Sequence, residues 1–479
     1  MSGARMDSEA VPPQACGSRK RVVVIGGGWA GCAAAVELAQ AGLAVQLHEA
    51  GVALGGRARA VVRDGLPLDN GQHLLLGAYA DTLAFAAAIR DRAAPSAWVT
   101  EPLTLRPFAP AQRNRLCFST RHVPAPLALP AALVRARGLS LAERMSLIRW
   151  FQRQRRQAFR CDASLTVDEL FAGEPAVIRA DLWNPLCVAA LNTPPARASA
   201  QVFLNVLRET FGAGARASAV VVPREGLAEA VPEAAARWLA ARGHLVRRST
   251  RTRVRGIDAS GVLLDASTGP VHADAVVVAV GPHQLASALP PDLGERDPAI
   301  AATLATVARF DYEPITTVYL GYAAPLALPR GLLRLDDAPG QWIFDRADIL
   351  GRAAASATRP AMRALVSVVI SARGAHSALD HKALAGATDA QLRTLVRKLP
   401  PLVWSQVIEE KRATYACVPG LSTPSCGRLS GRIYLAGDYT YAAFPATLEA
   451  AVRSGRRAAR EVIEYCATGA AARGSTRAP

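Results

Sequence analysis

A glycine-rich turn near the start of the chain has the spacing of a dinucleotide-binding loop. It follows a β-branched run at 21–25 and precedes an alanine-rich stretch that favours a helix to about residue 41. In such a loop the first glycine permits the tight bend, the second lets a pyrophosphate approach the backbone, and the third lets helix pack on strand. Free amides at the helix start then bind phosphate. The residues expected in this loop are Gly26, Gly28, Trp29, Ala30 and Gly31.

An acid and an arginine follow at positions where a nucleotide needs them. Glu49 ends the strand expected at 44–48, and a carboxylate there suits the two hydroxyls of an adenosine ribose. Gly56 and Arg57 come soon after, so that the arginine can hold phosphate while the glycine allows close approach. Because a second glycine pair follows the ribose acid directly, the pattern favours FAD over NAD.

The far end of the chain supplies a second set of candidates. The segment 432–438 is typical of a buried strand that ends in Gly437 and Asp438. We expect Asp438 to accept hydrogen bonds from a ribitol hydroxyl, although a solvated loop aspartate is the plainer alternative. A helix expected from about Leu448, with Thr447 at its start, points its positive dipole at the reduced flavin. The two ends of the chain should therefore meet in one site.

The length and composition describe a large folded chain. With 479 residues it exceeds the size that one core fills, so we expect two joined lobes. Because 51% of the residues are hydrophobic and only 20% are charged, general disorder is excluded. Since no apolar run reaches the roughly 18 to 20 residues that span a bilayer, an integral membrane protein is not expected.

Charge and cysteine content narrow the partners and the compartment. Lys and Arg number 56 against 39 Asp and Glu, and the net charge of +17 suits nucleic acid, an anionic membrane or an acidic substrate, unless arginine-rich coding explains it. No nucleic-acid recognition motif accompanies the charge, so we do not expect nucleic acid as a partner. The eight cysteines form no CxxC pair, and no histidine cluster has metal-ligand spacing. We therefore expect a reduced, cytoplasmic protein without a metal site.

Four segments together resemble the FAD-dependent amine oxidase and phytoene desaturase superfamily. They are GGGWAG at 26–31, GGRA at 55–58, LDNGQHLLLGAY at 68–79 and YLAGDYTYAAFPATLEAAVRSG at 434–455. The polar turn, the terminal motif and the segment 182–209 are more narrowly similar to the hydroxysqualene dehydroxylases, squalene-associated flavoproteins of bacterial hopanoid synthesis. The resemblance extends from residue 21 to about residue 465. It implies further FAD contacts from Gly71, Gln72 and the backbone of Val254, which matches the position that meets adenine.

Strand pattern and resemblance together predict an α/β fold. It combines a Rossmann-type FAD-binding lobe with a discontinuous α+β substrate-binding lobe. Only one glycine fingerprint is present, so electrons must reach the flavin from an external donor of unknown identity. The FAD lobe is expected at 20–79, 220–282 and 424–467, the substrate lobe at 80–219 and 283–423, and disordered tails at 1–19 and 468–479.

The resemblance implies that the enzyme removes the hydroxyl of hydroxysqualene reductively and yields squalene. Hydride would pass from N5 of reduced FAD to the allylic carbon, while an acid protonates the departing hydroxyl. His73 is the first choice for that acid because imidazole titrates near neutral pH, and Tyr439 and Tyr441 are the other candidates. Alternatively, His73 only hydrogen-bonds its own turn, and the tyrosines only wall a substrate tunnel.

Three other functions stay open at this point. A carotenoid-type desaturase uses the same cofactor site and a similar apolar tunnel in the oxidative direction, and an amine oxidase is a second enzymatic alternative. A prenyl-lipid carrier on the same fold is the non-enzymatic alternative. Such carriers lack an intact flavin site, whereas Glu49, Arg57 and Asp438 are all present here.

A helix within 108–159 carries apolar residues close to helical spacing among several arginines. It either rests in the headgroup region of an anionic membrane or packs on its own core. In the first case a long hydrocarbon enters from the bilayer, and the protein is peripheral to the inner face of the cytoplasmic membrane. The apolar positions are Leu141, Met145, Ile148, Trp150 and Phe151.

Overall fold

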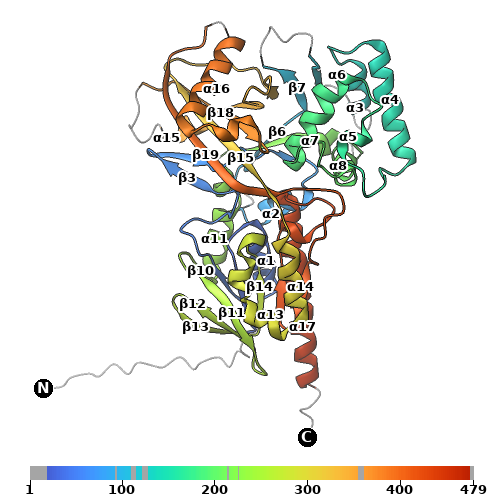
Figure 1. Ribbon diagram of the computed structural model, residues 1–479. Helices are drawn as coiled ribbons and strands as arrows, with labels where there is room; N and C mark the ends of the chain where they lie inside the picture. The colour runs from blue at the N-terminus through green and yellow to red at the C-terminus, as the bar shows by residue number, and fades with distance from the viewer. Residues whose placement is uncertain are drawn as a thin grey trace, which may run out of the picture.

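The chain forms two lobes, a slender one that carries both chain ends and a broader one stacked on it (Figure 1). The computed structural model describes residues 19–91, 94–108, 115–120, 128–212, 215–224, 226–353, 361–396 and 398–474. Most of the expected N-terminal tail, at 1–18, lies outside the described residues. So do residues 475–479 and parts of the segment expected to face a membrane, at 109–114 and 121–127.

The slender lobe is built on a six-stranded sheet. Its strands pair in parallel except for the outermost pair, β21 and β20, which is antiparallel. The central strands β1 and β14 are apolar and buried almost throughout, as expected for a parallel sheet covered on both faces. The spatial order is β10 (Leu245–Arg247), β2 (Ala44–His48), β1 (Arg21–Ile25), β14 (Ala275–Val278), β21 (Ile433–Leu435) and β20 (Gly427–Ser430).

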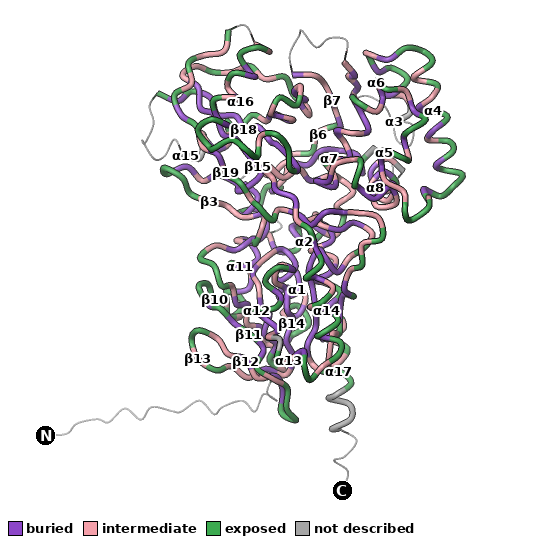
Figure 2. The backbone as a smooth tube through the Cα atoms, viewed as in Figure 1, coloured by how far each residue is buried: buried purple, intermediate pink, exposed green. Residues whose placement is uncertain are grey.

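Helices cover one face of this sheet, and a small sheet with further helices covers the other. On the first face α1 (Trp29–Gln40), α11 (Pro232–Ala240) and α17 (Leu448–Gly474) share one core with β1 and β2. On the second face the antiparallel strands β11 (Thr252–Ile257), β12 (Val262–Ala266) and β13 (Gly269–Ala273) pack with α12 (Leu285–Ala288) and α14 (Pro298–Ala308). The buried backbone therefore runs through the middle of the lobe (Figure 2).

Helix α17 ties the end of the chain to its beginning. It packs along α1, and a Cβ at Gly455 would lie 2.1 Å from the carbonyl oxygen of Ala30. The helix runs to Gly474, so the tail expected from residue 468 is wrong over 468–474. That segment contains several alanines, the residue with the highest helix propensity, which explains why the helix continues.

The broader lobe is built on a seven-stranded sheet. One face packs on α16 (His381–Leu395), and the other packs on a helical group that includes α4 (Leu141–Arg156), α7 (Asn184–Leu191) and α8 (Ala200–Leu207). Strands β15, β18 and β17 pair antiparallel. The spatial order is β19 (Leu402–Tyr415), β15 (Tyr312–Tyr322), β18 (Ala364–Ser371), β17 (Trp342–Asp345), β16 (Leu332–Arg334), β7 (Thr104–Pro107) and β8 (Phe118–Ser119).

A further, three-stranded sheet crosses the boundary that the sequence places between the lobes. Strand β9 (Val220–Pro223) pairs with β5 (Leu75–Leu76) and with β6 (Trp98–Glu101). Because β6 belongs to a segment assigned to the substrate lobe, the two lobes share this sheet. The remaining elements are β3 (Ala60–Arg63), β4 (Leu66–Asp69), α2 (Ala80–Ala88), α3 (Ala128–Val134), α5 (Val167–Leu170), α6 (Ala176–Ile178), η2 (Arg179–Trp183), η3 (Arg208–Gly212), α9 (Ala215–Ser218), α10 (Leu227–Ala230), η4 (Pro282–Gln284), α13 (Pro291–Arg296), α15 (Ala347–Ala353), η5 (Ala375–Ala378) and η6 (Asp438–Thr440).

The apolar stripe expected on 141–151 is divided between core and surface. Trp150 is buried, with its ring 5.2 Å from that of Phe171 and 4.7 Å from that of Trp183. Phe151 packs against the same cluster. Leu141 and Met145 are 77% and 43% exposed. The stripe is therefore not one continuous membrane face, because its C-terminal half belongs to the core of the lobe.

Gly455→Ala should destabilise the protein, because the added Cβ forces α17 away from Ala30. The expected loss in the free energy of unfolding, measured by chemical denaturation, is about 1–3 kcal/mol. Gly386→Ala on α16 is the matched control, since nothing lies within 4 Å of a Cβ at that exposed position. Equal destabilisation by the two substitutions would contradict the close helix contact.

Candidate cofactor and active site

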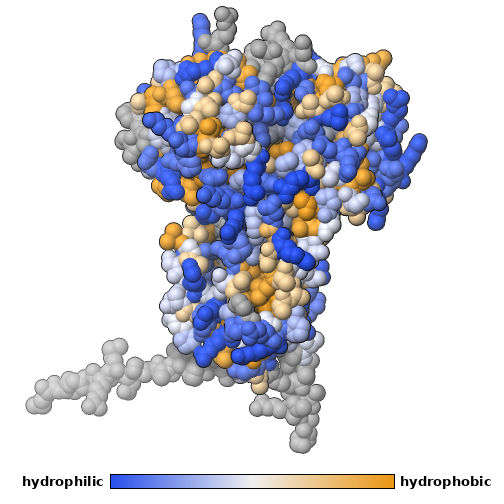
Figure 3. Space-filling model, viewed as in Figure 1, coloured by the Kyte–Doolittle hydropathy of each residue, from blue (hydrophilic) through white to orange (hydrophobic). Residues whose placement is uncertain are grey.

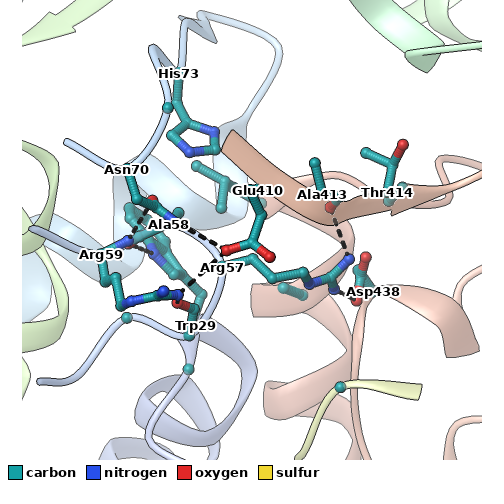
Figure 4. Close-up of a pocket in the computed structure, with 18 of the residues that line it drawn as sticks. Trp29, Arg57, Ala58, Arg59, Asn70, His73, Glu410, Ala413, Thr414 and Asp438 are labelled. Carbon is teal, nitrogen blue, oxygen red and sulfur yellow. Dashed lines mark hydrogen bonds and ion pairs between the residues drawn. The ribbon is translucent and has the colours of Figure 1, made fainter. Parts of the chain in front are cut away.

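A cavity of about 930 Å³ lies where the two lobes meet. Residues from both ends of the chain and from the seven-stranded sheet line it. Figure 4 shows side chains from these separate segments converging on the same space, with Arg57 and Asp438 on one side and His73 on another. The cavity therefore joins a region of polar turns to a region of sheet side chains.

The glycine turn forms one wall of this cavity. Gly26 has a positive φ of 107°, and its amide donates to the carbonyl of His48 at 2.8 Å, so the first glycine makes the bend. Gly28, Trp29 and Ala30 line the cavity. Gly31 does not; a Cβ there would lie 1.8 Å from the carbonyl oxygen of Gly26. The third glycine is required for packing of helix on strand.

A second pair of glycines lies against the first turn at the wall of the cavity. A Cβ at Gly56 would lie 3.4 Å from the Cα of Gly28, and both residues line the cavity. Since neither residue has a side chain, the two turns pack closely along the cavity wall. The start of α1 has no side-chain cap, so its first amides are available to a phosphate.

Glu49 lies at the end of β2 with its carboxylate held by backbone amides. Oε2 accepts from the amide of Gly27 at 2.7 Å, and Oε1 accepts from the amide of Gly51 at 2.7 Å. Each carboxylate oxygen can accept a second hydrogen bond, and Glu49 lines the cavity. The arrangement leaves acceptors for a pair of hydroxyls.

Arg57 and the buried Asp438 form an ion pair between the two ends of the chain, with the Arg57 side chain 24% exposed. Arg57 Nη1 also donates to the carbonyl of Ala413 at 3.1 Å. Burial alone would lower the pKa of the Arg57 guanidinium, but the neighbouring Asp438 carboxylate outweighs it, and the pKa is raised. The sequence predicted separate roles on phosphate and ribitol for these side chains, whereas the structure joins them.

The start of α17 completes this wall. Gly437, Thr447 and Leu448 line the cavity, and α17 begins at Leu448 as expected. Thr447 Oγ1 accepts from the amide of Ala450 at 3.0 Å and thereby caps the helix. Its N-terminal end faces the cavity.

Of the three candidate acids, only His73 lines the cavity. Burial lowers the pKa of His73 below its ordinary value, and its Nε2 is buried without a hydrogen-bond partner in the described part of the chain. The imidazole is therefore neutral near pH 7 and lacks the additional proton that an imidazolium acid donates. This finding weighs against the role that the sequence assigns to it.

The structure places the two tyrosines away from the cavity, contrary to expectation. Tyr439 is fully buried in the core of the slender lobe, and burial raises the pKa of its hydroxyl. The hydroxyl of Tyr441 accepts from Arg453 Nη1 at 3.1 Å, and its ring stacks on Phe444. Neither side chain is in a position to wall the chamber or to donate a proton within it.

Val254 is expected to meet adenine through its backbone, and that contact stays a prediction. The residue is fully buried in β11 and does not line the cavity, which is bordered instead by Thr250, Arg251 and Thr252.

Gly71 and Gln72 line the cavity, and an arginine from a distant segment holds the turn that carries them. Arg346 Nη1 donates to Gln72 Oε1 at 2.7 Å, and its Nη2 donates to Asp69 Oδ2 at 3.0 Å. Its pKa is raised because the Asp69 carboxylate outweighs the effect of burial. No local motif marks Arg346, so the sequence did not indicate this contact.

Glu410 is a further cavity residue that the sequence did not indicate. Its Oε2 accepts from Asn70 Nδ2 at 3.2 Å, next to Arg59 (Figure 4). The only sequence signal for this contact is that its partner, Asn70, belongs to the polar turn at 68–79. Glu410 is 340 residues away from it in the chain.

The rest of the cavity is lined mainly by apolar side chains. They come from α7 and from four strands of the seven-stranded sheet, so the chamber has a wall of regular elements. Such a wall suits a long hydrocarbon chain. Its members are Leu186, Ala189, Ala190, Ile315, Leu332, Trp342, Phe344 and Val369.

Comparison with known proteins identifies the class. The family described as flavin containing amine oxidoreductase matches residues 29–463. The fold resembles that of an oxidoreductase from Methanosarcina mazei, with a TM-score of 0.68 and 16% identity over 93% of this chain and 100% of that one. The chain therefore belongs to the flavin-containing amine oxidoreductase family, and it is a FAD-dependent oxidoreductase with an α/β fold.

Two curated relatives that match nearly the whole sequence share one name. The chain is 31% identical to a hydroxysqualene dehydroxylase from Rhodopseudomonas palustris, over 93% of this chain and 98% of the relative. It is 28% identical to a hydroxysqualene dehydroxylase from Sinorhizobium fredii, over 92% of this chain and 97% of the relative.

The residues present fit FAD. Because Gly28 and Gly56 have no side chains, a pyrophosphate could approach both turns next to the uncapped start of α1, and Glu49 offers acceptors for a ribose. Asp438 and the start of α17 line the same cavity, which also contains the apolar chamber. These residues would hold the cofactor with its redox-active end toward that chamber.

Glu49→Ala should give folded protein with FAD affinity reduced about tenfold or more, because hydrogen bonds to a charged group are lost. Flavin absorbance of the purified protein and titration with FAD measure the effect. Glu37→Ala on α1 is the control, since Glu37 pairs with Arg456 and Arg460 outside the cavity. Wild-type FAD affinity in the Glu49 variant would contradict the assignment of the ribose site.

Proposed function

We propose that this protein is a hydroxysqualene dehydroxylase, which removes the hydroxyl of hydroxysqualene and yields squalene. The observation that carries the proposal is one continuous cavity, in which the polar cradle for FAD opens into an apolar chamber. The names of the two curated relatives support the same reaction. Bound FAD in its reduced form supplies hydride chemistry, and an external donor must reduce it.

The chain's own residues bind and orient the substrate. The apolar wall excludes water from the reacting carbon, which keeps a cationic carbon from being recaptured as the alcohol. Val369 and Trp342, paired across β18 and β17, form part of a rigid surface against which a hydrocarbon can lie. The positioning of the reacting carbon thus depends on regular secondary structure rather than on loops.

Anaerobic turnover tests this function. The purified flavoprotein, reduced with dithionite, is expected to convert hydroxysqualene to squalene while the flavin becomes oxidised. Product is identified by gas chromatography and the flavin is followed by absorbance. Reduced flavin without squalene would contradict the proposal. Formation of a more unsaturated hydrocarbon by the oxidised protein would indicate a desaturase, oxidation of amines an amine oxidase, and a colourless lipid-binding protein a carrier.

We further propose that α4 lies on an anionic membrane surface, at the inner face of the cytoplasmic membrane. Leu141 and Met145 are exposed near its start, and the arginines at 149, 153 and 156 line a shallow depression along it. Figure 3 shows hydrophilic side chains on the outer edge of the broader lobe, where Figure 1 places this helix. Arginines beside exposed apolar residues suit lipid phosphates and acyl chains.

In the part of the chain that the structure describes, no helix is both long and apolar enough to cross a membrane.

Vesicle binding tests the α4 surface. Arg149→Glu with Arg156→Glu should weaken binding to phosphatidylglycerol-containing vesicles at least about tenfold, because each basic residue contributes about 1 kcal/mol. Arg255→Glu with Arg309→Glu, both exposed on the slender lobe, changes the net charge equally and should have a smaller effect. Equal loss in both double variants would indicate general charge attraction rather than docking through α4.

A further inference from the structure

Glu410 is an acidic side chain on the sheet face that walls the chamber. It lies on β19 directly opposite Ile315 of β15, and Ile315 lies opposite Ser371 of β18. Residues directly opposite one another across paired strands point to the same face of the sheet. All three line the cavity. The carboxyl group of Glu410 therefore borders the space in which an apolar substrate would lie.

The same strand connects Glu410 to the cofactor side of the cavity. Further along β19, the carbonyl of Ala413 accepts from Arg57, which pairs with Asp438. Figure 4 shows Glu410 between His73 and the Arg57 and Asp438 pair. Glu410 thus lies at the junction between cradle and chamber, where the reacting carbon must meet the cofactor.

One oxygen of Glu410 is held and the other is available. Oε2 accepts from Asn70 Nδ2 at 3.2 Å and is 3.5 Å from Arg59 Nη1. Asn70 is buried, and its Oδ1 accepts from the amide of Arg59 at 3.1 Å, which fixes its Nδ2 toward Glu410. Within the described ranges, Oε1 has no hydrogen-bond partner. Oε1 is therefore free to contact a substrate.

Other acidic groups of the cavity are already engaged. Both oxygens of Glu49 accept backbone amides, and Asp438 is paired with Arg57. The imidazole of His73 is neutral because it is buried. Glu410 is likewise held through Oε2, by Asn70 and Arg59, but among the described lining residues it is the carboxyl group carried by the sheet that walls the chamber.

We propose that Glu410 is the catalytic acid that protonates the departing hydroxyl, an inference that rests on the proposed dehydroxylation. The proton of Oε1 passes to the hydroxyl oxygen, the carbon–oxygen bond breaks, and water leaves with the bonding electron pair. The carbon then accepts a hydride with its two electrons from a reduced flavin, which becomes oxidised. Glu410 is left as a carboxylate, held by Asn70, and takes up a proton from solvent before the next turnover.

Glu410→Gln tests this role with two substrates. Hydroxysqualene turnover should fall about a hundredfold or more, since a general acid contributes on that scale. The acetate ester of hydroxysqualene carries a leaving group that departs as a carboxylate without a proton, so its reduction to squalene should stay within a few-fold of wild type. Glu410→Asp should restore part of the turnover of the alcohol.

Two measurements separate chemistry from folding. Flavin content and squalene binding, followed by the fluorescence of Trp342 in the cavity wall, should match wild type in Glu410→Gln. The variant His73→Asn serves as the matched control and should lose less turnover of the alcohol than Glu410→Gln.

Two results would overturn the proposal: wild-type turnover of hydroxysqualene by Glu410→Gln, or an equal loss on the alcohol and the ester. If the wild-type protein, with flavin bound and reduced, makes no squalene from either compound, the dehydroxylase function itself fails, and the role of Glu410 fails with it.

Discussion

The ion pair between the partly exposed Arg57 and the buried Asp438 is the interaction on which the site depends. A charge removed from water needs a partner, and loss of one member of such a pair typically costs about 3–5 kcal/mol. This pair connects the turn after Glu49 to the end of β21, and through the carbonyl of Ala413 it also holds β19. Three segments that are distant in sequence are thereby fixed around one cavity.

The two sheets contribute in different ways to that cavity. The parallel sheet ends its strands β1, β2 and β21 in glycines and acids, which is where α/β folds bind nucleotides. The seven-stranded sheet contributes a broad apolar face whose polar exceptions include Glu410 and Ser371. Because both surfaces border one space, a redox cofactor and a hydrocarbon can meet without intervening solvent.

The sequence predicted what local patterns determine. Glycine spacing placed the bend at Gly26 and the packing position at Gly31, and strand periodicity placed Glu49 at a strand end and the start of α17 at Leu448. These features depend on neighbours within a few residues. The sequence therefore anticipated the glycine turn, the place of Glu49 and the α/β class of the fold, while the contacts of individual residues with FAD stay predictions.

Features that depend on distant partners could not be predicted in this way. The position of Glu410 in the cavity wall depends on the pairing of β19 with β15 and on the hydrogen bond from Asn70 of the other lobe. The spacing of Trp150 predicted a place on an apolar surface stripe, yet Phe171 and Trp183 pack against it in the core. Tyr439 follows a strand end like Asp438, but its side chain points into the core.

The central claim is that an alcohol carbon is reduced within the cavity that also holds the flavin. A single turnover in deuterium oxide tests it most directly, because hydrogen on reduced flavin nitrogens exchanges with solvent. The account predicts squalene that carries one deuterium, at the carbon that bore the hydroxyl, for each flavin oxidised. Squalene without deuterium, or flavin oxidation without squalene, would contradict it.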